Sequence, residues 1–287
     1  MTAEAYTLAL PERRDTSVIF SSPHSGRKYT AAFLAQTVLN AQSIRSSEDA
    51  FVDILIEKAT VFGAPLISAV APRAFIDLNR SVDELDPGVI EGVSRGMHNP
   101  RVSSGLGVIP RVVANGRAIY SGKIDHEDAQ DRITRFWHPY HAALRQLIAE
   151  SHSGFGEAIL IDVHSMPHEA IDSHSKFGRP KPEVVLGDRF GTAAGRDVMD
   201  RVEAAFAAVG LRVVRNAPFA GAHITQAYGR PQQCQHVVQV EIDRSLYLDE
   251  ARVEPSGTFA AFQKLMSGVV ADLSAIGRAG EIKLAAE

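Results

Sequence analysis

The sequence predicts an α/β protein built on a mostly parallel β-sheet with helices on both faces. Short apolar runs of strand length lie at residues 17–21, 65–70, 159–163, 184–186 and 237–242. Segments with helical spacing separate most of these runs, and strands that alternate with helices favour a parallel sheet. The chain has 287 residues, 45% of them hydrophobic, so it can bury one sizeable core. We therefore expect one catalytic domain over residues 1–287, with residues 1–14 as a peripheral extension.

The remaining elements follow from the same periodicities. Helices are expected at residues 31–39, 47–62, 125–151, 192–209 and 256–276, and further strands at 74–78 and 211–215. Ser47 is a suitable N-cap for the second helix, with Glu48 and Asp49 in its first turn. An Asn-Gly pair predicts a hairpin at residues 108–117. The segment 81–107 shows no clean period, and we interpret it as a functional loop that could act as a lid.

Composition excludes several classes of function. Charged residues make up 22% of the chain and the formal net charge is −4, so nothing indicates a nucleic-acid partner. The single cysteine, Cys234, excludes an intramolecular disulfide and suits a reducing compartment. We find no signal-peptide pattern and no apolar run of about 18 residues, so a cytoplasmic location without a membrane partner is expected.

Side chains that can bind a metal or transfer a proton lie at the ends of three predicted strands. His24 follows the first strand, His164 follows residues 159–163, and Glu241 lies near the end of residues 237–242. Ligands of α/β proteins bind beyond the carboxyl ends of the strands. Two imidazoles and one carboxylate suit a catalytic zinc that keeps a position open for water. Glu241 would then be the general base that takes the proton of this water.

The acidic ligand has two candidates, Asp49 and Glu48, of which we prefer Asp49. Asp162 lies two residues before His164 and could orient its ring. Each of these groups could have a simpler role. His24 could lie in a tight turn, Asp49 could be an acid favoured by the helix dipole, and Glu241 could be a hydrogen-bonded carboxylate at a strand edge. No HExxH or paired-cysteine motif supports the metal by spacing alone.

Candidate groups for binding an anionic substrate lie at other strand and loop ends. Arg80 could bind a carboxylate through its forked guanidinium, with Asn79 as a neutral donor beside it. Arg230, Arg244 and His223 are further candidates, although an arginine in such a position can also be structural. His138 and His141 form an i, i+3 pair on the long helix, which we interpret as a surface pair rather than a metal site.

Four short motifs occur in an order that resembles one enzyme family. They are SPHSG at residues 22–26, IDLNR at 76–80, IDVHS at 161–165 and QVEIDRSLY at 239–247. Together with LGD at 186–188 and YGRP at 228–231, they resemble the N-formylglutamate amidohydrolase family over roughly residues 15–270. That family is similar in fold to zinc carboxypeptidases and aspartoacylase-like enzymes. The resemblance implies a three-layer α/β/α sandwich with a mixed, mostly parallel sheet and zinc at its carboxyl edge.

The resemblance also implies roles for individual residues. His24, His164 and Asp49 would hold one zinc ion, and Glu241 would be the catalytic glutamate. Carboxypeptidases carry His-x-x-Glu in the first motif, whereas this chain does not, so Glu48 remains the alternative acidic ligand. The pair at residues 79–80 resembles the Asn-Arg pair that holds a substrate carboxylate in carboxypeptidases.

The implied activity is zinc-dependent hydrolysis of the N-formyl amide of N-formyl-L-glutamate or a similar small anionic N-acyl amino acid. Another N-acyl amino acid deacylase or a carboxypeptidase is the first alternative. A metal-free amino-acid-binding protein that uses Arg80 and Arg230 is the second.

Overall fold

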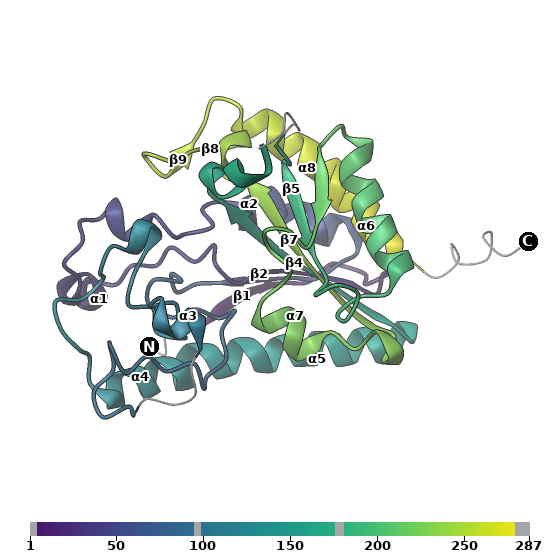
Figure 1. The fold of residues 1–287 in the computed structure, drawn as a ribbon. Coiled ribbons are helices and arrows are strands. Elements are labelled where there is room, and N and C mark those ends of the chain that lie inside the picture. The colour runs from purple at the N-terminus through teal and green to yellow at the C-terminus, as the bar shows by residue number, and fades with distance from the viewer. Residues whose placement is uncertain (1–4, 95–98, 176–180, 279–287) are drawn as a thin grey trace, which may run out of the picture.

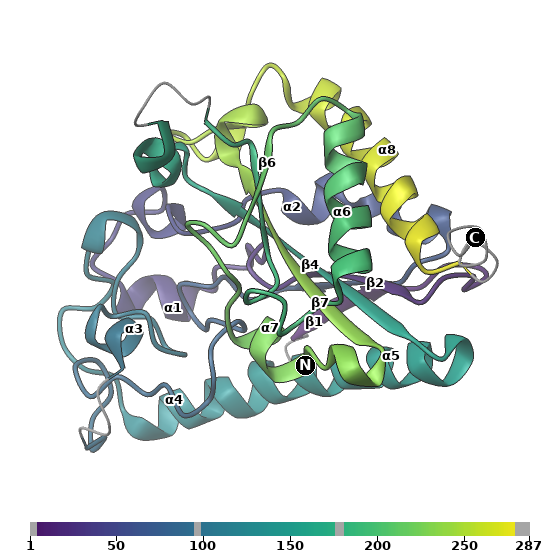
Figure 2. The ribbon, with the colours of Figure 1, turned by 45° about the vertical axis from the view of Figure 1, so that its right-hand side comes forward.

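A computed structural model describes residues 5–94, 99–175 and 181–278. In this part, a seven-stranded sheet lies between two layers of helices (Figures 1 and 2), which confirms the predicted three-layer α/β/α class. The strands are β1 (Tyr6–Ala9), β2 (Val18–Ser22), β3 (Leu66–Ala69), β4 (Ala158–Met166), β5 (Val184–Gly187), β6 (Val213–Arg215) and β7 (Gln235–Asp243), with a separate small pair β8 (Leu248–Asp249) and β9 (Glu254–Pro255). The α-helices are α1 (Ala31–Gln36), α2 (Val52–Leu55), α3 (Pro100–Ser103), α4 (His126–Arg132), α5 (His138–Phe155), α6 (Arg196–Ala208), α7 (His223–Tyr228) and α8 (Phe259–Ile276).

The sheet is mixed, with parallel strands at its centre. Its order is β1-β3-β2-β4-β7-β5-β6. The strands β3, β2, β4 and β7 are mutually parallel, whereas β1 pairs antiparallel with β3 and β5 antiparallel with β7. The carboxyl ends of the four central strands therefore meet at one edge. The shared site predicted from the sequence depends on this arrangement.

Strand alternation divides the core between the two faces of the sheet. On β4, Ile159 and Ile161 belong to the cluster beneath α2, α6 and α8, whereas Leu160 belongs to the cluster beneath α4, α5 and α7. All nine residues of β4 are buried, as expected of a central parallel strand covered on both sides. Helix α8 is long and apolar enough for a membrane span by length and composition, but six of its buried residues pack in this core.

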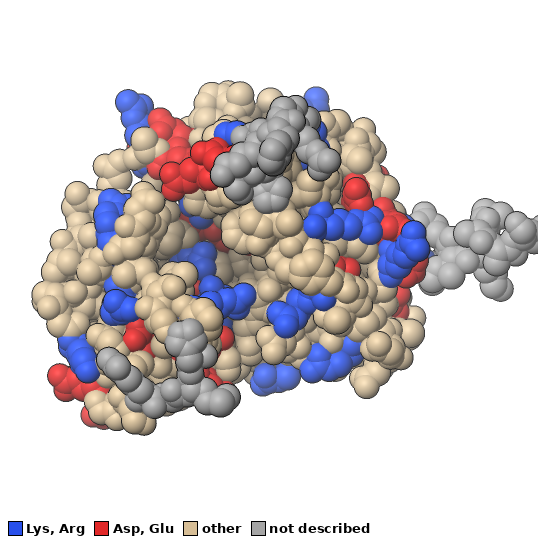
Figure 3. All heavy atoms as spheres, viewed as in Figure 1, with Lys and Arg blue, Asp and Glu red and all other residues tan. Residues whose placement is uncertain are grey.

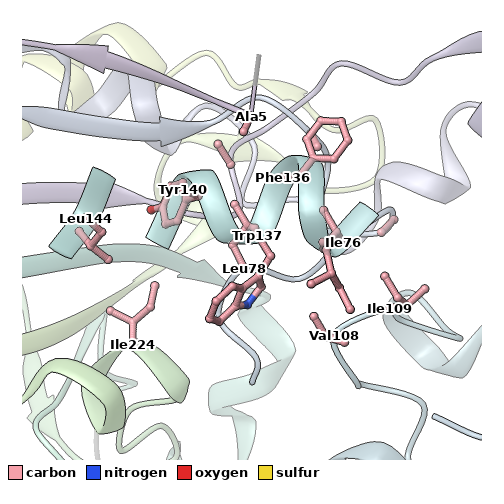
Figure 4. Close-up of a cluster of buried hydrophobic side chains, with 14 of the residues drawn as sticks. Ala5, Ile76, Leu78, Val108, Ile109, Phe136, Trp137, Tyr140, Leu144 and Ile224 are labelled. Atoms are coloured by element: carbon pink, nitrogen blue, oxygen red, sulfur yellow. The ribbon is translucent and has the colours of Figure 1, made fainter. Parts of the chain in front are cut away.

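The predicted strand at residues 74–78 and the predicted hairpin at residues 108–117 are wrong. The first segment is irregular, although its apolar residues alternate as in a strand: Ile76 and Leu78 are fully buried, and they point toward Phe136 and Trp137 (Figure 4). The second contains a 3-10 turn, and only one bridge, Val112 to Ala118, joins its arms. In both segments, burial against α4 and α5 replaces strand pairing.

Two helices differ from the predicted ones. The helix expected at residues 47–62 begins only at Val52, and its N-cap is Phe51 in the left-handed region rather than Ser47. The segment around His223, which reads as a polar loop, is helix α7. Of the loop 81–107, residues 95–98 lie outside the described residues. The rest is partly anchored because Val89 and Ile90 are fully buried, and a lid function stays a prediction.

The long helix is interrupted where a buried arginine lies. A π-helical turn, Ile133–Trp137, separates α4 from α5 just before Pro139. The guanidinium of Arg132 is fully buried; it stacks 4.2 Å above the ring of Phe75, donates to the hydroxyl of Tyr120 at 2.7 Å and pairs with Asp128 at 2.7 Å. This arginine ties the helix to the irregular segment that leads into residues 76–80.

We expect Arg132→Ala to lower the free energy of unfolding by about 3 kcal/mol, because it leaves buried polar partners unsatisfied and opens a cavity. Arg135→Ala, three residues away, removes an exposed ion pair with Asp131 and should change stability by no more than about 0.5 kcal/mol. Urea unfolding of both variants measures the difference. Equal midpoints would show that the Arg132 network contributes nothing.

Candidate active site

One face of β4 and β7 changes from apolar to polar toward the carboxyl ends. On β4, Asp162 and His164 follow Leu160 on the same face, and on β7 Gln239 and Glu241 follow an apolar residue. His164 and Glu241 are direct partners in the parallel register. Since neighbouring strands lie about 4.8 Å apart, these two side chains stand side by side on this face.

His24, Asp49 and His164 form one buried cluster. The Oδ2 atom of Asp49 lies 2.9 Å from His164 Nδ1 and 3.4 Å from His24 Nδ1, and the two rings lie 4.7 Å apart. All three residues are at most 2% exposed. One donor atom from each lies within 4.8 Å of the others, so the three could bind a common metal ion.

Each imidazole is held from behind by a second carboxylate. His24 Nε2 lies 2.6 Å from Asp77 Oδ1, and His164 Nε2 lies 3.0 Å from Asp162 Oδ2. With an ion bound, Nε2 would carry the proton and donate to these carboxylates, which would leave the lone pair of each Nδ1 for the ion. The Nδ1 atom of His24 is buried and has no hydrogen-bond partner among the described residues. A cation between the rings would satisfy it, so the residues present fit a metal ion.

The electrostatics of the cluster favour a positive charge. Burial alone would raise the pKa of Asp49, but the hydrogen bonds and charges of His164 and His24 hold it well below its usual value. Burial opposes the charged form of His164, yet Asp162 and Asp49 raise its pKa well above the ordinary value. The site therefore holds ionised carboxylates that a divalent cation can neutralise.

The turn that carries His24 is fixed by a close backbone contact. A Cβ atom on Gly26 would lie 2.1 Å from the carbonyl oxygen of Ala71, so only glycine fits there. Ser22 and Ser25 join their hydroxyls at 2.9 Å across the turn. The SPHSG motif thus docks His24 against the segment that leads to Asp77.

The two candidates for the acidic ligand have different surroundings. Asp49 uses Oδ2 for the histidines, while its Oδ1 accepts from Arg244 at 2.9 Å. Arg244 also donates to Ser165, so it positions the aspartate. Glu48 instead accepts from Arg45 at 3.0 Å and from the hydroxyl of Tyr29 at 3.0 Å, away from the cluster. The geometry favours Asp49.

Glu241 combines proximity to the cluster with an unusual acidity. Burial raises its pKa to about 7, and the negative charge of Asp49 adds to the rise, against the opposing charges of His164 and Arg73. Its Oε1 accepts from Gln239 at 2.8 Å. A carboxylate with a pKa near neutrality can both take up and return a proton.

Asn79 and Arg80 line the same cavity, but their side chains have different hydrogen-bond partners. The Nδ2 atom of Asn79 lies 3.1 Å from His164 Nε2, and its Oδ1 accepts from the backbone of Ile224 at 2.7 Å. The Asn79 amide thus joins β4 to α7. Arg80 donates Nε to the carbonyl of Leu106 at 2.9 Å and Nη1 to that of Asn79 at 3.0 Å. Substrate binding by either side chain stays a prediction. The position of Arg80 supports this role better than the position of Asn79 does.

Arg230 and His223 do not line the cavity. Arg230 is exposed, and its guanidinium donates to backbone carbonyls of Gln226 and Gly229. His223 lies beside Trp137 on α7. The charges of Arg80 and Asp77 act on His223. Substrate binding by Arg230 or His223 stays a prediction.

Two contributors were not recognisable from the sequence. Arg73 lines the cavity and donates to Asp77 Oδ2 at 2.9 Å. His141 is fully buried rather than a surface residue, and burial lowers its pKa to about 3. The neutral ring donates from Nε2 to the carbonyl of Leu78 at 2.8 Å and accepts from the hydroxyl of Tyr228. It supports the segment 76–80 from behind.

A cavity of about 540 Å³, a volume suited to a small ligand, is lined by His24, Asp77, Asn79, Arg80, His164 and Glu241 among others. Figure 3 shows a hollow on this face of the molecule with Lys and Arg side chains around it. An α/β sandwich with buried histidines and carboxylates that could hold a metal ion, beside a glutamate at the carboxyl ends of parallel strands, is the arrangement expected of a hydrolase.

The chain belongs to the N-formylglutamate amidohydrolase family, whose model matches residues 16–248. It is 30% identical to an N-formylglutamate deformylase of Pseudomonas aeruginosa over 83% of this chain and 85% of that one, and 29% identical to one of Pseudomonas putida over 81% and 82%. A crystal structure of N-formylglutamate amidohydrolase from Ralstonia eutropha JMP134 superposes with a TM-score of 0.89 at 33% identity, over 96% of this chain and 99% of that one. The family resemblance of the sequence motifs is thereby confirmed.

We expect His164→Ala to reduce the zinc content of the purified protein at least tenfold, because the variant loses one donor and leaves two carboxylates without their partner. His152→Ala, on an exposed position of α5, is the control and should keep the wild-type content. Elemental analysis after dialysis measures both. Wild-type zinc in His164→Ala would exclude this histidine as a ligand.

Proposed function

We propose that the protein is a zinc-dependent amidohydrolase that removes the formyl group from N-formyl-L-glutamate or a closely related N-acyl amino acid. The observation that carries the proposal is the buried His24–Asp49–His164 cluster beside Glu241 in a cavity lined by arginines. Membership of the family and the names of its relatives support the substrate class.

His24, Asp49 and His164 would hold the metal ion. When bound, zinc lowers the pKa of a water molecule and polarises the substrate carbonyl. Asp77 and Asp162 keep the two imidazoles in the tautomer that leaves Nδ1 free for the ion.

Glu241 would move the proton in both halves of the reaction. Its carboxylate accepts a proton from water as the water oxygen bonds to the formyl carbon. The same carboxyl group then delivers this proton to the amide nitrogen as the C–N bond breaks, which releases formate and the free amino acid. A pKa of about 7 suits both transfers.

Two arginines would stabilise the negative charges of the substrate and of the transition state. Although burial opposes it, the carboxylates of Asp77, Asp49 and Glu241 raise the pKa of Arg73, so this guanidinium stays charged beside the reacting atoms. Arg80 would bind the α-carboxylate of the amino acid through its forked guanidinium.

We expect Glu241→Gln to lower kcat by about 10²- to 10⁴-fold while zinc content stays at the wild-type level, because the amide cannot accept the proton. Glu150→Gln, on an exposed position of α5, should keep wild-type kinetics. Formate release and elemental analysis are measured on the same preparations. Wild-type turnover in Glu241→Gln would exclude the role as base.

We expect Arg80→Ala to raise KM for N-formyl-L-glutamate by about 10- to 100-fold, because a charge-assisted pair with the carboxylate is lost. The matched substrate is the α-carboxamide of the same compound, for which KM should stay within about twofold. Equal losses on both substrates would indicate a structural arginine.

A substrate panel separates this activity from its relatives. Purified protein is tested with N-formyl, N-acetyl and N-succinyl glutamate and with a dipeptide that has a free carboxyl terminus. We expect kcat/KM to be highest for the formyl compound. Preference for the dipeptide would instead indicate a carboxypeptidase, and no turnover of any compound despite glutamate binding would indicate a binding protein.

A further inference from the structure

The cavity carries more positive charge than one carboxylate requires. Four arginines line it: Arg73, Arg80, Arg101 and Arg244. Arg73 and Arg244 each form a 2.9 Å ion pair with a buried aspartate of the site. These two are therefore held at the cluster, beside the reacting atoms, which leaves the other two for the carboxylates of a ligand.

The two remaining arginines have few internal partners. The guanidinium of Arg80 donates to two backbone carbonyls, and the nearest carboxylate, that of Glu84, lies 3.9 Å away. The side chain of Arg101 makes no hydrogen bond or ion pair within residues 5–94, 99–175 and 181–278. Only its backbone is engaged: the N–H donates to Asn99 and the carbonyl accepts from Leu106. A cation without a partner on a cavity wall is available to an anion.

Arg80 and Arg101 lie at different depths of one wall. Arg80 is 8% exposed and follows Asn79, whose amide contacts a histidine of the cluster. Arg101 is exposed, on the short helix α3. The two charges are close enough to interact: after burial, the charges of Arg73 and Arg101 lower the pKa of Arg80 further.

The depths of the two arginines match the distances of the two carboxylates from the scissile amide in a dicarboxylic substrate. In an N-formyl amino acid, the α-carboxylate is attached to the carbon that bears the scissile amide, and a side-chain carboxylate lies further out. A deep arginine suits the first group and a rim arginine suits the second.

We propose that Arg101 is a specificity-determining residue that binds the side-chain carboxylate of an N-formyl dicarboxylic amino acid, while Arg80 binds the α-carboxylate. The inference rests on the proposed function and names the substrate class within it. It assigns the preference for an acidic side chain to one residue of the loop 81–107.

The test compares N-formyl-L-glutamate with N-formyl-L-glutamine, which differ only in the charge of the side chain. In Arg101→Gln, we expect kcat/KM for the glutamate compound to fall about 10- to 100-fold, mainly through KM. For the glutamine compound it should stay within about twofold, which also shows that the variant is folded. Arg117→Gln removes an exposed arginine that does not line the cavity, and it should leave the glutamate-to-glutamine ratio unchanged.

Two results in Arg101→Gln would overturn the inference while the proposed function stands: an equal loss on both substrates, or no loss on either. If the wild-type enzyme hydrolyses neither compound, the proposed function fails. Calorimetric binding of glutarate, a dicarboxylate without an amide, to wild type and Arg101→Gln then tests the inference by itself. At least tenfold weaker binding by the variant supports it, and equal binding overturns it.

Discussion

Hydrogen bonds between two buried carboxylates and two buried imidazoles are the constraint on which the site depends. Asp77 and Asp162 are at most 2% exposed, and a buried carboxylate without a partner is costly. Asp162 is satisfied by Ser21 at 2.6 Å as well as by His164. Because these bonds fix which nitrogen of each ring faces Asp49, the direction of the donor atoms is set before any ion binds.

The core behind the site keeps this arrangement in place. Residues 76–80 alternate, so Ile76 and Leu78 enter the hydrophobic cluster (Figure 4) while Asp77 and Asn79 turn to the cavity. Trp137 donates its indole N–H to the carbonyl of Arg80 at 2.9 Å. Packing of the helix layer therefore positions both the carboxylate behind His24 and the arginine that we assign to the substrate.

The sequence predicted the parts of the site that follow a visible strand end. His24, His164 and Glu241 each lie where a buried apolar run stops, and the mixed sheet brings these ends to one edge. The sequence did not indicate Arg73 or His141, because their roles come from contacts with residues distant in the chain. The irregular segment 74–78 was misread for a related reason: its alternation reflects burial against α5, which local periodicity cannot distinguish from strand pairing.

The charge balance of the cavity is compatible with the proposed binding of a dianion by a chain with a net charge of −4. Buried aspartates around the cluster neutralise two of the four cavity arginines, so the charge that attracts a ligand comes from the remaining pair. Neither arginine of that pair makes a hydrogen bond or ion pair with His24, Asp49 or His164 among the described residues. A substitution at Arg101 can therefore change the charge offered to the substrate's carboxylates while the charge at the reacting atoms stays the same.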